Sequence, residues 1–183
     1  MTFFSDYYAG LGKCLALAPE ADMDKIVGML AAIPAKGGKV ILVGNGGSAA
    51  MAAHVSVDLT KAAGIRAVTF NEADLLTCFA NDYGYENWVT EALKAYADPK
   101  DLVVLISSSG KSPNITNGAK QARAMGLGIV TLSGFTADNP LRTLGDVNLW
   151  CDSKSYNFVE MAHHIWLLAA VDKAIADKEA RKA

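Results

Sequence analysis

Short apolar runs alternate with amphipathic segments along this 183-residue chain, and this alternation limits its possible folds more than any other feature. Five runs are short and rich in branched side chains, which is typical of buried strands. They are KVILVG (39–44), AVTF (67–70), DLVVLISS (101–108), LGIVTLSG (127–134) and DVNLWC (146–151). The pattern therefore predicts five strands that are buried on both faces.

Helical patterns occupy the intervals between these runs. The expected helices cover residues 48–62, 72–80, 86–96, 113–125 and 157–178. Strands that alternate with helices are joined by crossover connections, so the strands run parallel. The sequence therefore predicts a layered α/β fold.

Two further helical segments, residues 3–16 and 20–35, precede the first strand. The chain is long enough for one well-filled core, so we expect a single domain over residues 1–183. Residues 37–178 would form its α/β core. Helices that precede a complete α/β unit must bury their apolar faces elsewhere, so residues 1–36 are expected to pack in an oligomer.

Composition excludes several functional classes. A formal net charge of −2 with 20% charged residues gives no case for a nucleic-acid surface. No apolar run approaches the roughly 20 residues that cross a bilayer, so no membrane association is expected. The three widely spaced cysteines, Cys14, Cys78 and Cys151, fit reduced thiols better than disulfides. We expect a cytoplasmic protein whose cysteines lie in the core.

The stretch GNGGS (44–48) joins the first predicted strand to a predicted helix. Ligands of α/β sheets bind at this position, and amides at the start of a helix attract anions. The stretch matches neither the GxGxxG dinucleotide fingerprint nor the GxxxxGK[ST] phosphate loop, so no nucleotide cofactor is expected. It is either a ligand-facing turn or a tight turn that binds nothing.

A second loop, ISSSGKSPN (106–114), follows the third predicted strand and precedes another helix. Its hydroxyls belong to Ser107, Ser108, Ser109 and Ser112. Four hydroxyls and the free amides of a helix start suit the oxygens of a phosphate group. Ser112 alone could simply cap the helix, but four serines at one strand end favour phosphate binding over capping.

Together the segments VGNGGSAAMAAH, ANDYG and ISSSGKSPN resemble the sugar isomerase (SIS) domain family. The resemblance extends over residues 3–175 and is strongest to the phosphoheptose isomerase branch, which includes a DnaA-associated regulatory member. It implies a flavodoxin-like three-layer sandwich with five parallel strands. It also implies a homotetramer with pockets at subunit boundaries, and the isomerisation of sedoheptulose 7-phosphate to an aldose phosphate.

The resemblance also implies which residues surround the sugar phosphate. The serine loop would hold the phosphate, while the glycine turn and Asp82 would surround the sugar. The implied substrate-binding residues are Asn45, Gly46, Gly47, Ser48, Asp82, Ser107, Ser108, Ser109 and Ser112.

Two helical pairs could supply the proton transfers that isomerisation requires. His54 and Asp58 are spaced i, i+4, and Glu160 and His164 have the same spacing, so each pair shares a helix face. Asp58, Glu160 and His164 are the candidate catalytic residues. The family usually has glutamate where Asp58 stands, a proposed catalytic base that is one methylene longer.

The last predicted helix departs further from the family pattern QExHxxxxH. Aligning its glutamine with Glu160 places His163 at the first histidine and Leu168 at the second. The partner acid or base is then missing. The standard isomerase mechanism cannot be transferred to this chain without modification.

His54, Asp58, Glu160 and His164 together also suit zinc or another divalent metal. The resemblance supports this set, because some members of the family hold zinc at equivalent positions, and a metal could polarise the carbonyl of the sugar. The alternative is that these four residues are ordinary core, interface or surface side chains.

Three functions remain open. The first is a sugar-phosphate isomerase, the second a sensor that binds sugar phosphates without turnover, and the third a regulatory tetramer like the DnaA-associated member. The retained phosphate loops favour the first, and Leu168 is the main argument for the others.

Overall fold

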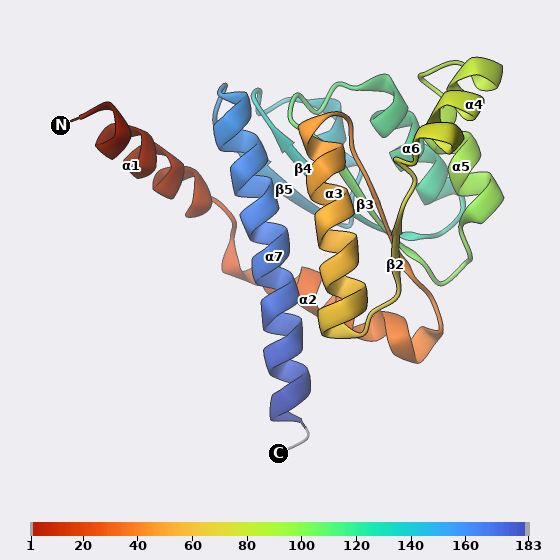
Figure 1. Cartoon of the computed structure of the whole chain (residues 1–183), viewed down its shortest axis with the longest axis horizontal. Helices are drawn as coiled ribbons and strands as arrows, with labels where there is room; N and C mark the ends of the chain where they lie inside the picture. The colour runs from red at the N-terminus through yellow and green to blue at the C-terminus, as the bar shows by residue number, and fades with distance from the viewer. Residues whose placement is uncertain (1, 182–183) are drawn as a thin grey trace.

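The computed structural model describes residues 2–181 and shows a single sheet of five parallel strands covered by helices (Figure 1). The strands are β1 (Val40–Val43), β2 (Ala67–Thr69), β3 (Leu102–Ser107), β4 (Gly128–Gly134) and β5 (Val147–Cys151). Their spatial order is β2-β1-β3-β4-β5, which is the flavodoxin-like order. The expected three-layer α/β sandwich is confirmed.

Helices cover both faces of the sheet. They are α1 (Phe3–Leu15), α2 (Glu20–Lys36), α3 (Gly47–Asp58), α4 (Ala73–Tyr83), α5 (Trp88–Tyr96), α6 (Pro113–Ala124) and α7 (Tyr156–Ala180). Two short turns, the π-helical η1 (Leu59–Ala63) and the 3₁₀-helical η2 (Pro140–Thr143), complete the set. None of the helices within residues 2–181 combines the length and apolarity that crossing a membrane requires.

Successive side chains of each strand point to opposite faces of the sheet, and this divides the core into two halves. In β3, Leu102, Val104 and Ile106 face the half that also contains α2, α3 and α7. Val103 and Leu105 face the other half, with α5 and α6. All six residues of β3 are buried, because it lies between β1 and β4 with helices on both faces.

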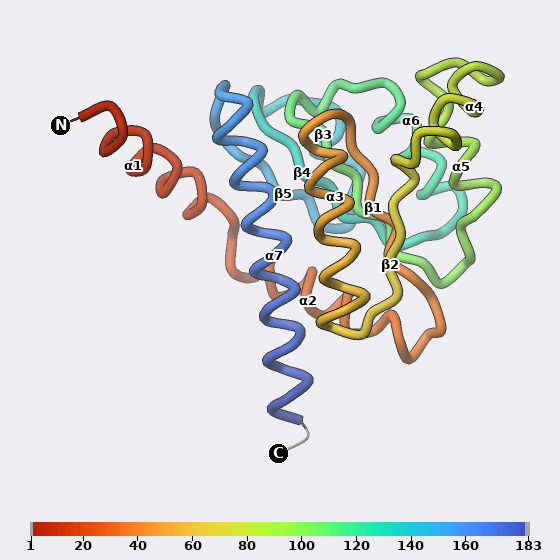
Figure 2. The backbone as a smooth tube through the Cα atoms, viewed as in Figure 1, coloured from red at the N-terminus to blue at the C-terminus, as the bar shows by residue number. Residues whose placement is uncertain are grey.

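Two helices begin at the carboxyl edge of the sheet, and they run side by side away from that edge. The chain leaves β1 directly into α3, and α7 follows β5 (Figure 2). Helix α1 contacts α7 and projects beyond the sheet (Figure 1). The α1–α7 contact includes a hydrogen bond of 2.9 Å from Trp166 Nε1 to Leu15 O. The residues that begin α3 and α7 are thus brought together beside the strand ends.

Two cysteines behave as the sequence predicts, since Cys14 and Cys151 are buried free thiols. Cys78 is exposed on α4, so the expectation that it lies in the core is wrong. Helix α4 contains no buried residue, because it packs on the outside of α5 rather than on the sheet.

Candidate active site

The glycine turn brings the backbone of α3 close to neighbouring groups. Gly46 has φ +54°, a conformation that glycine adopts without strain. A Cβ on Gly44 would collide with the backbone of Ser48, and one on Gly47 would overlap the carboxylate of Glu160. Glycine is therefore required for the tight turn and for the approach of Glu160 to the start of α3.

The serine loop lies at the end of β3. Ser107 Oγ and Ser112 Oγ are 3.0 Å apart, and Ser109 Oγ accepts a hydrogen bond of 3.2 Å from the amide of Lys111. Ser108 is only 7% exposed, and its Oγ has no hydrogen-bond partner within residues 2–181. A buried hydroxyl without a partner is costly, so Ser108 is suited to a ligand that supplies one.

The two turns border one pocket of about 180 Å³. Its lining residues are Asn45, Ser48, Ile106, Ser107, Ser108, Ser109, Ser112, Tyr156 and Glu160. Asn45 and Asn114 exchange hydrogen bonds of 3.0 and 2.9 Å, which link the glycine turn to the start of α6. The expected convergence of the two turns is therefore present in the fold.

Glu160 is the one carboxylate among the described residues that line this pocket. It belongs to the first turns of α7 and contacts Gly47 at the start of α3. Burial raises the pKa of its carboxyl group. Glu160 can therefore accept a hydrogen bond from a sugar hydroxyl, or donate one when it is protonated.

His54, Asp58 and His164 form a second group beside the pocket, between α3 and α7. His54 Nδ1 lies 3.0 Å from His164 Nε2, and His54 Nε2 lies 3.3 Å from Asp58 Oδ2. Burial and the nearby His54 lower the pKa of His164, and Asp58 opposes this shift. An ionised Asp58 selects the His54 tautomer with a proton on Nε2, so Nδ1 of a neutral His54 accepts from His164.

The expected metal set is only partly assembled. The two ring nitrogens of His54 are directed at different partners, and Glu160 is directed at Gly47. Across residues 2–181, no three His, Cys, Asp or Glu side chains are arranged to hold a metal ion. The side chains as placed do not fit a zinc site, so the metal stays a prediction from the sequence.

Asp82 is not brought to the pocket of its own chain. It is exposed near the end of α4, where its Oδ1 accepts a hydrogen bond of 2.9 Å from Asn81. The role that the resemblance implies for Asp82 stays a prediction.

Sequence reasoning missed three residues of the site. Tyr156 lines the pocket at the start of α7, one residue before the expected helix. Tyr85 Oη donates a hydrogen bond of 3.0 Å to Asn45 Oδ1, the acceptor that Asn114 also uses. Asn114 stands inside the quoted serine motif, so its position was the available signal. Tyr156 and Tyr85 lie outside the motifs and gave none.

His163 lies on the core side of α7 and is fully buried. Its Nε2 lies 2.9 Å from the carbonyl oxygen of Ser133, to which the neutral ring donates. Burial lowers the pKa of His163 to about 4, so the ring is neutral at physiological pH. His163 therefore links α7 to β4 and does not take part in the group around His54.

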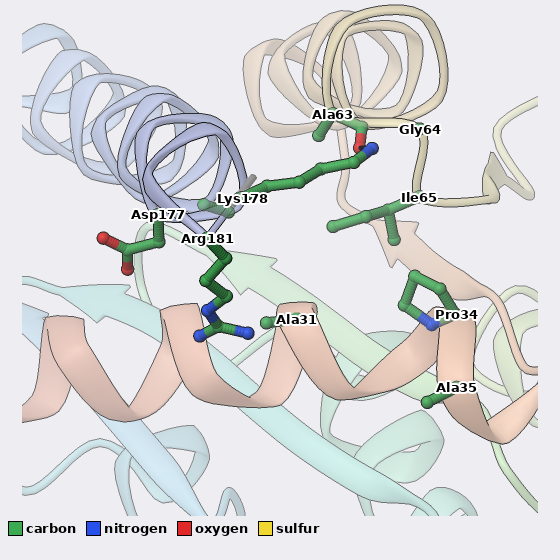
Figure 3. Close-up of a pocket in the computed structure, with 10 residues that line it drawn as sticks. Ala31, Pro34, Ala35, Ala63, Gly64, Ile65, Asp177, Lys178 and Arg181 are labelled. Atoms are coloured by element: carbon green, nitrogen blue, oxygen red, sulfur yellow. Dashed lines mark hydrogen bonds between the residues drawn. The ribbon is translucent and has the colours of Figure 1, made fainter. Parts of the chain in front are cut away.

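A larger cavity of about 360 Å³ lies at the other end of α7, between α2 and η1 (Figure 3). Its walls are mainly alanine, proline and isoleucine. Lys178 donates a hydrogen bond of 2.8 Å to Ala63 O, so this cation caps the end of η1. Helices α2, η1 and α7 all end here, and helix C-termini disfavour anions. None of the residues that the sequence singles out for the site lines this cavity.

Comparisons with known proteins show which sequences and structures the chain resembles. A family model described as the SIS domain matches residues 6–134. The phosphoheptose isomerase of Burkholderia pseudomallei (strain 1710b) is 34% identical over 176 residues, covering 89% of this chain and 88% of that protein. The phosphoheptose isomerase of Fusobacterium nucleatum is 36% identical over 118 residues, which span 62% of this chain and 61% of that protein.

Solved structures show the same fold. The phosphoheptose isomerase from Neisseria gonorrhoeae superimposes with a TM-score of 0.84 at 22% identity, over 93% of this chain and 97% of that chain.

Proposed function

The chain belongs to the SIS domain family, and from this premise we propose that it is an aldose–ketose isomerase of a seven-carbon sugar phosphate. The supporting observation is the pocket shared by the glycine turn and the serine loop, which Ser108 lines and where its buried Oγ has no hydrogen-bond partner among residues 2–181. Relatives named phosphoheptose isomerase support sedoheptulose 7-phosphate as the substrate.

The phosphate is held by the serine hydroxyls and the first amides of α6. The carbonyl and its neighbouring carbon lie at the opposite end of the sugar from a 7-phosphate. The substrate therefore extends from the serine loop past Glu160 into the space between α3 and α7. One step of four residues along α7 is about 6 Å, and this step leads from Glu160 to His164.

The reacting end of the sugar then lies beside the group formed by Asp58, His54 and His164. Isomerisation through an enediol needs a base for the proton on carbon and a group that moves protons between the two oxygens. Asp58 is the base, positioned by His54, and His164 exchanges protons with the oxygens. Glu160 aligns the carbon chain of the sugar by a hydrogen bond to one of the sugar hydroxyls.

A direct test is incubation of the protein with sedoheptulose 7-phosphate in D₂O. We expect an aldose phosphate to form with deuterium on the carbon next to the carbonyl, because a base on the enzyme exchanges its proton with solvent. NMR of the sugar protons measures both events. A sugar phosphate that raises the melting temperature but is neither converted nor labelled would contradict the isomerase and favour a sensor.

The sensor and the DnaA-associated type of regulator stay as the alternative because of Leu168. Leu168 lies on α7 and packs partly buried against the core, and its aliphatic side chain has no group that can transfer a proton. In the isomerase, His164, one turn earlier on α7, provides the imidazole.

We also propose that the chain assembles with further copies of itself, as a homotetramer by resemblance, and acts in the cytoplasm. Phe3, Phe4 and Tyr8 on α1 are 74%, 65% and 66% exposed, and Met161 and Ile165 on the adjacent α7 are 40% and 41% exposed. Large apolar side chains gathered on neighbouring helices are typical of an interface between subunits.

Replacing Phe4 and Tyr8 by glutamate is therefore expected to reduce the oligomer to smaller species, because it places charges in the apolar interface. Light scattering after size exclusion measures the mass. Glutamate at Val68, a 37% exposed residue of the edge strand β2, is the matched control. An unchanged mass in the α1 variant would contradict this interface.

A further inference from the structure

The serine loop packs against the connection between β4 and η2. Asn139 caps η2 and is only 1% exposed. Its Nδ2 donates to Ser133 Oγ at 3.2 Å, Gly134 O at 3.2 Å and Thr136 O at 2.8 Å. Its Oδ1 accepts from the amide of Arg142 at 3.1 Å. Both ends of the side-chain amide are engaged, so its orientation is fixed.

Asn139 occupies the space that a side chain at Gly110 would need. Gly110 is the turn residue of the serine loop, with φ +64°, and a Cβ there would overlap Asn139 Oδ1 and Cγ. Gly110 O also accepts a hydrogen bond of 3.2 Å from the amide of Leu141. The loop is therefore attached to the β4–η2 connection by packing and by a backbone hydrogen bond.

A second contact supports the same loop from β4. A Cβ on Gly134 would lie 3.0 Å from Ser108 O and would collide with Val159. Ser133, next to it, is bonded to Asn139 through its hydroxyl and to His163 through its carbonyl. Hydrogen bonds to the end of β4 thus position Asn139, and packing against Asn139 positions Gly110.

We propose that Asn139 is a positioning residue that holds the serine loop in its phosphate-binding shape. Asn139 does not line the pocket, so it acts through Gly110. Hydroxyls and amides that are held in place before binding lose less entropy when the anion arrives, which strengthens binding. The identity of the ligand as a sugar phosphate rests on the proposed function, whereas the geometry of the support does not.

The test compares the binding of two probes, inorganic phosphate and sedoheptulose 7-phosphate, by titration calorimetry. Asn139→Asp keeps the size of the side chain but replaces the donating Nδ2 with an oxygen that faces three acceptors. We expect the Kd for both probes to rise at least about tenfold, on the basis of one or two lost hydrogen bonds. Where turnover is measured, KM should rise while kcat changes less than about threefold.

Gly110→Ala and Asn139→Gly supply a sharper measurement. Gly110→Ala alone collides with Asn139 and should weaken phosphate binding more than Asn139→Asp does. The collision is absent in an Asn139→Gly background, so Gly110→Ala should weaken binding by a smaller factor there than in the wild type. Gly126→Ala is the matched control, since Gly126 also has a positive φ (+70°) but nothing lies within 4 Å of its Cβ position.

Three results would overturn the proposal: an unchanged Kd in Asn139→Asp, an effect of Gly110→Ala no larger than that of Gly126→Ala, or an effect of Gly110→Ala that is equally large in the wild type and in Asn139→Gly. If Asn139→Asp does not fold, Asn139→Ser replaces it, with the same expectation. Binding of phosphate that depends on Asn139 without any turnover would uphold the support and contradict only the isomerase. A wild-type protein that binds neither probe would overturn both.

Discussion

Asp58→Asn is expected to lower kcat for sedoheptulose 7-phosphate at least about 100-fold, because a positioned acid or base contributes roughly 10²–10⁴ to the rate. Asparagine has the size of aspartate but cannot take a proton from carbon. Its amide also no longer fixes the tautomer of His54, whose Nε2 lies 3.3 Å from Asp58 in the wild type. Steady-state kinetics with NMR detection of the aldose phosphate measures the loss.

Binding separates this effect from damage to the fold. Asp58 does not line the phosphate pocket, so the Kd for sedoheptulose 7-phosphate should change less than about threefold in Asp58→Asn. Glu160→Gln is the matched control, because it also exchanges a carboxylate for an amide next to α3. Since glutamine can still bond a hydroxyl, this variant should keep most of kcat. Full activity in Asp58→Asn, or a larger loss in Glu160→Gln, would assign the base to Glu160 instead.

Although the edge strand β2 contains no buried residue, the layered fold could be predicted because its central strands β1, β3 and β4 are buried on both faces. Such strands read as continuous apolar runs, and each of the five expected runs contains an observed strand. The end of α3 could not be predicted. Residues 48–62 read as one helix, but the structure changes to the π-helical η1 at Leu59, and one extra residue per turn leaves little trace in a hydrophobic pattern.

The two phosphate-facing turns could also be predicted, since glycines and serines at strand ends carry a local signal. The side chains that surround each catalytic candidate could not be predicted. Glu160 and His164 share one face of α7, yet Glu160 faces the start of α3 while His164 meets His54 a turn further along. The relative placement of two helices decides this difference. The support of Gly110 by Asn139 was hidden for the same reason, because 29 positions separate them in the chain.

Ser108→Ala is expected to separate stability from binding. In the ligand-free protein Ser108 Oγ is buried and has no partner among residues 2–181, so its removal should leave the melting temperature unchanged or raise it. Binding of sedoheptulose 7-phosphate should weaken about 10- to 100-fold, because a hydrogen bond to a charged group contributes roughly 1.5–3 kcal/mol. A hydroxyl with a purely structural role would give the opposite pattern, a lower melting temperature with unchanged binding.

Ser108→Asp extends this test to its largest effect, since it places a carboxylate where the phosphate is held. Repulsion between the two anions, added to the lost hydrogen bond, should weaken binding more than 100-fold. Ala124→Asp on the exposed surface of α6 adds the same charge away from the pocket and from the proposed interface, and it should leave the Kd unchanged. Thermal shift and calorimetry with sedoheptulose 7-phosphate measure both variants. If Ser108→Asp bound the sugar phosphate as tightly as Ala124→Asp, the phosphate could not lie against the serine loop. The substrate would then have to bind with its phosphate elsewhere.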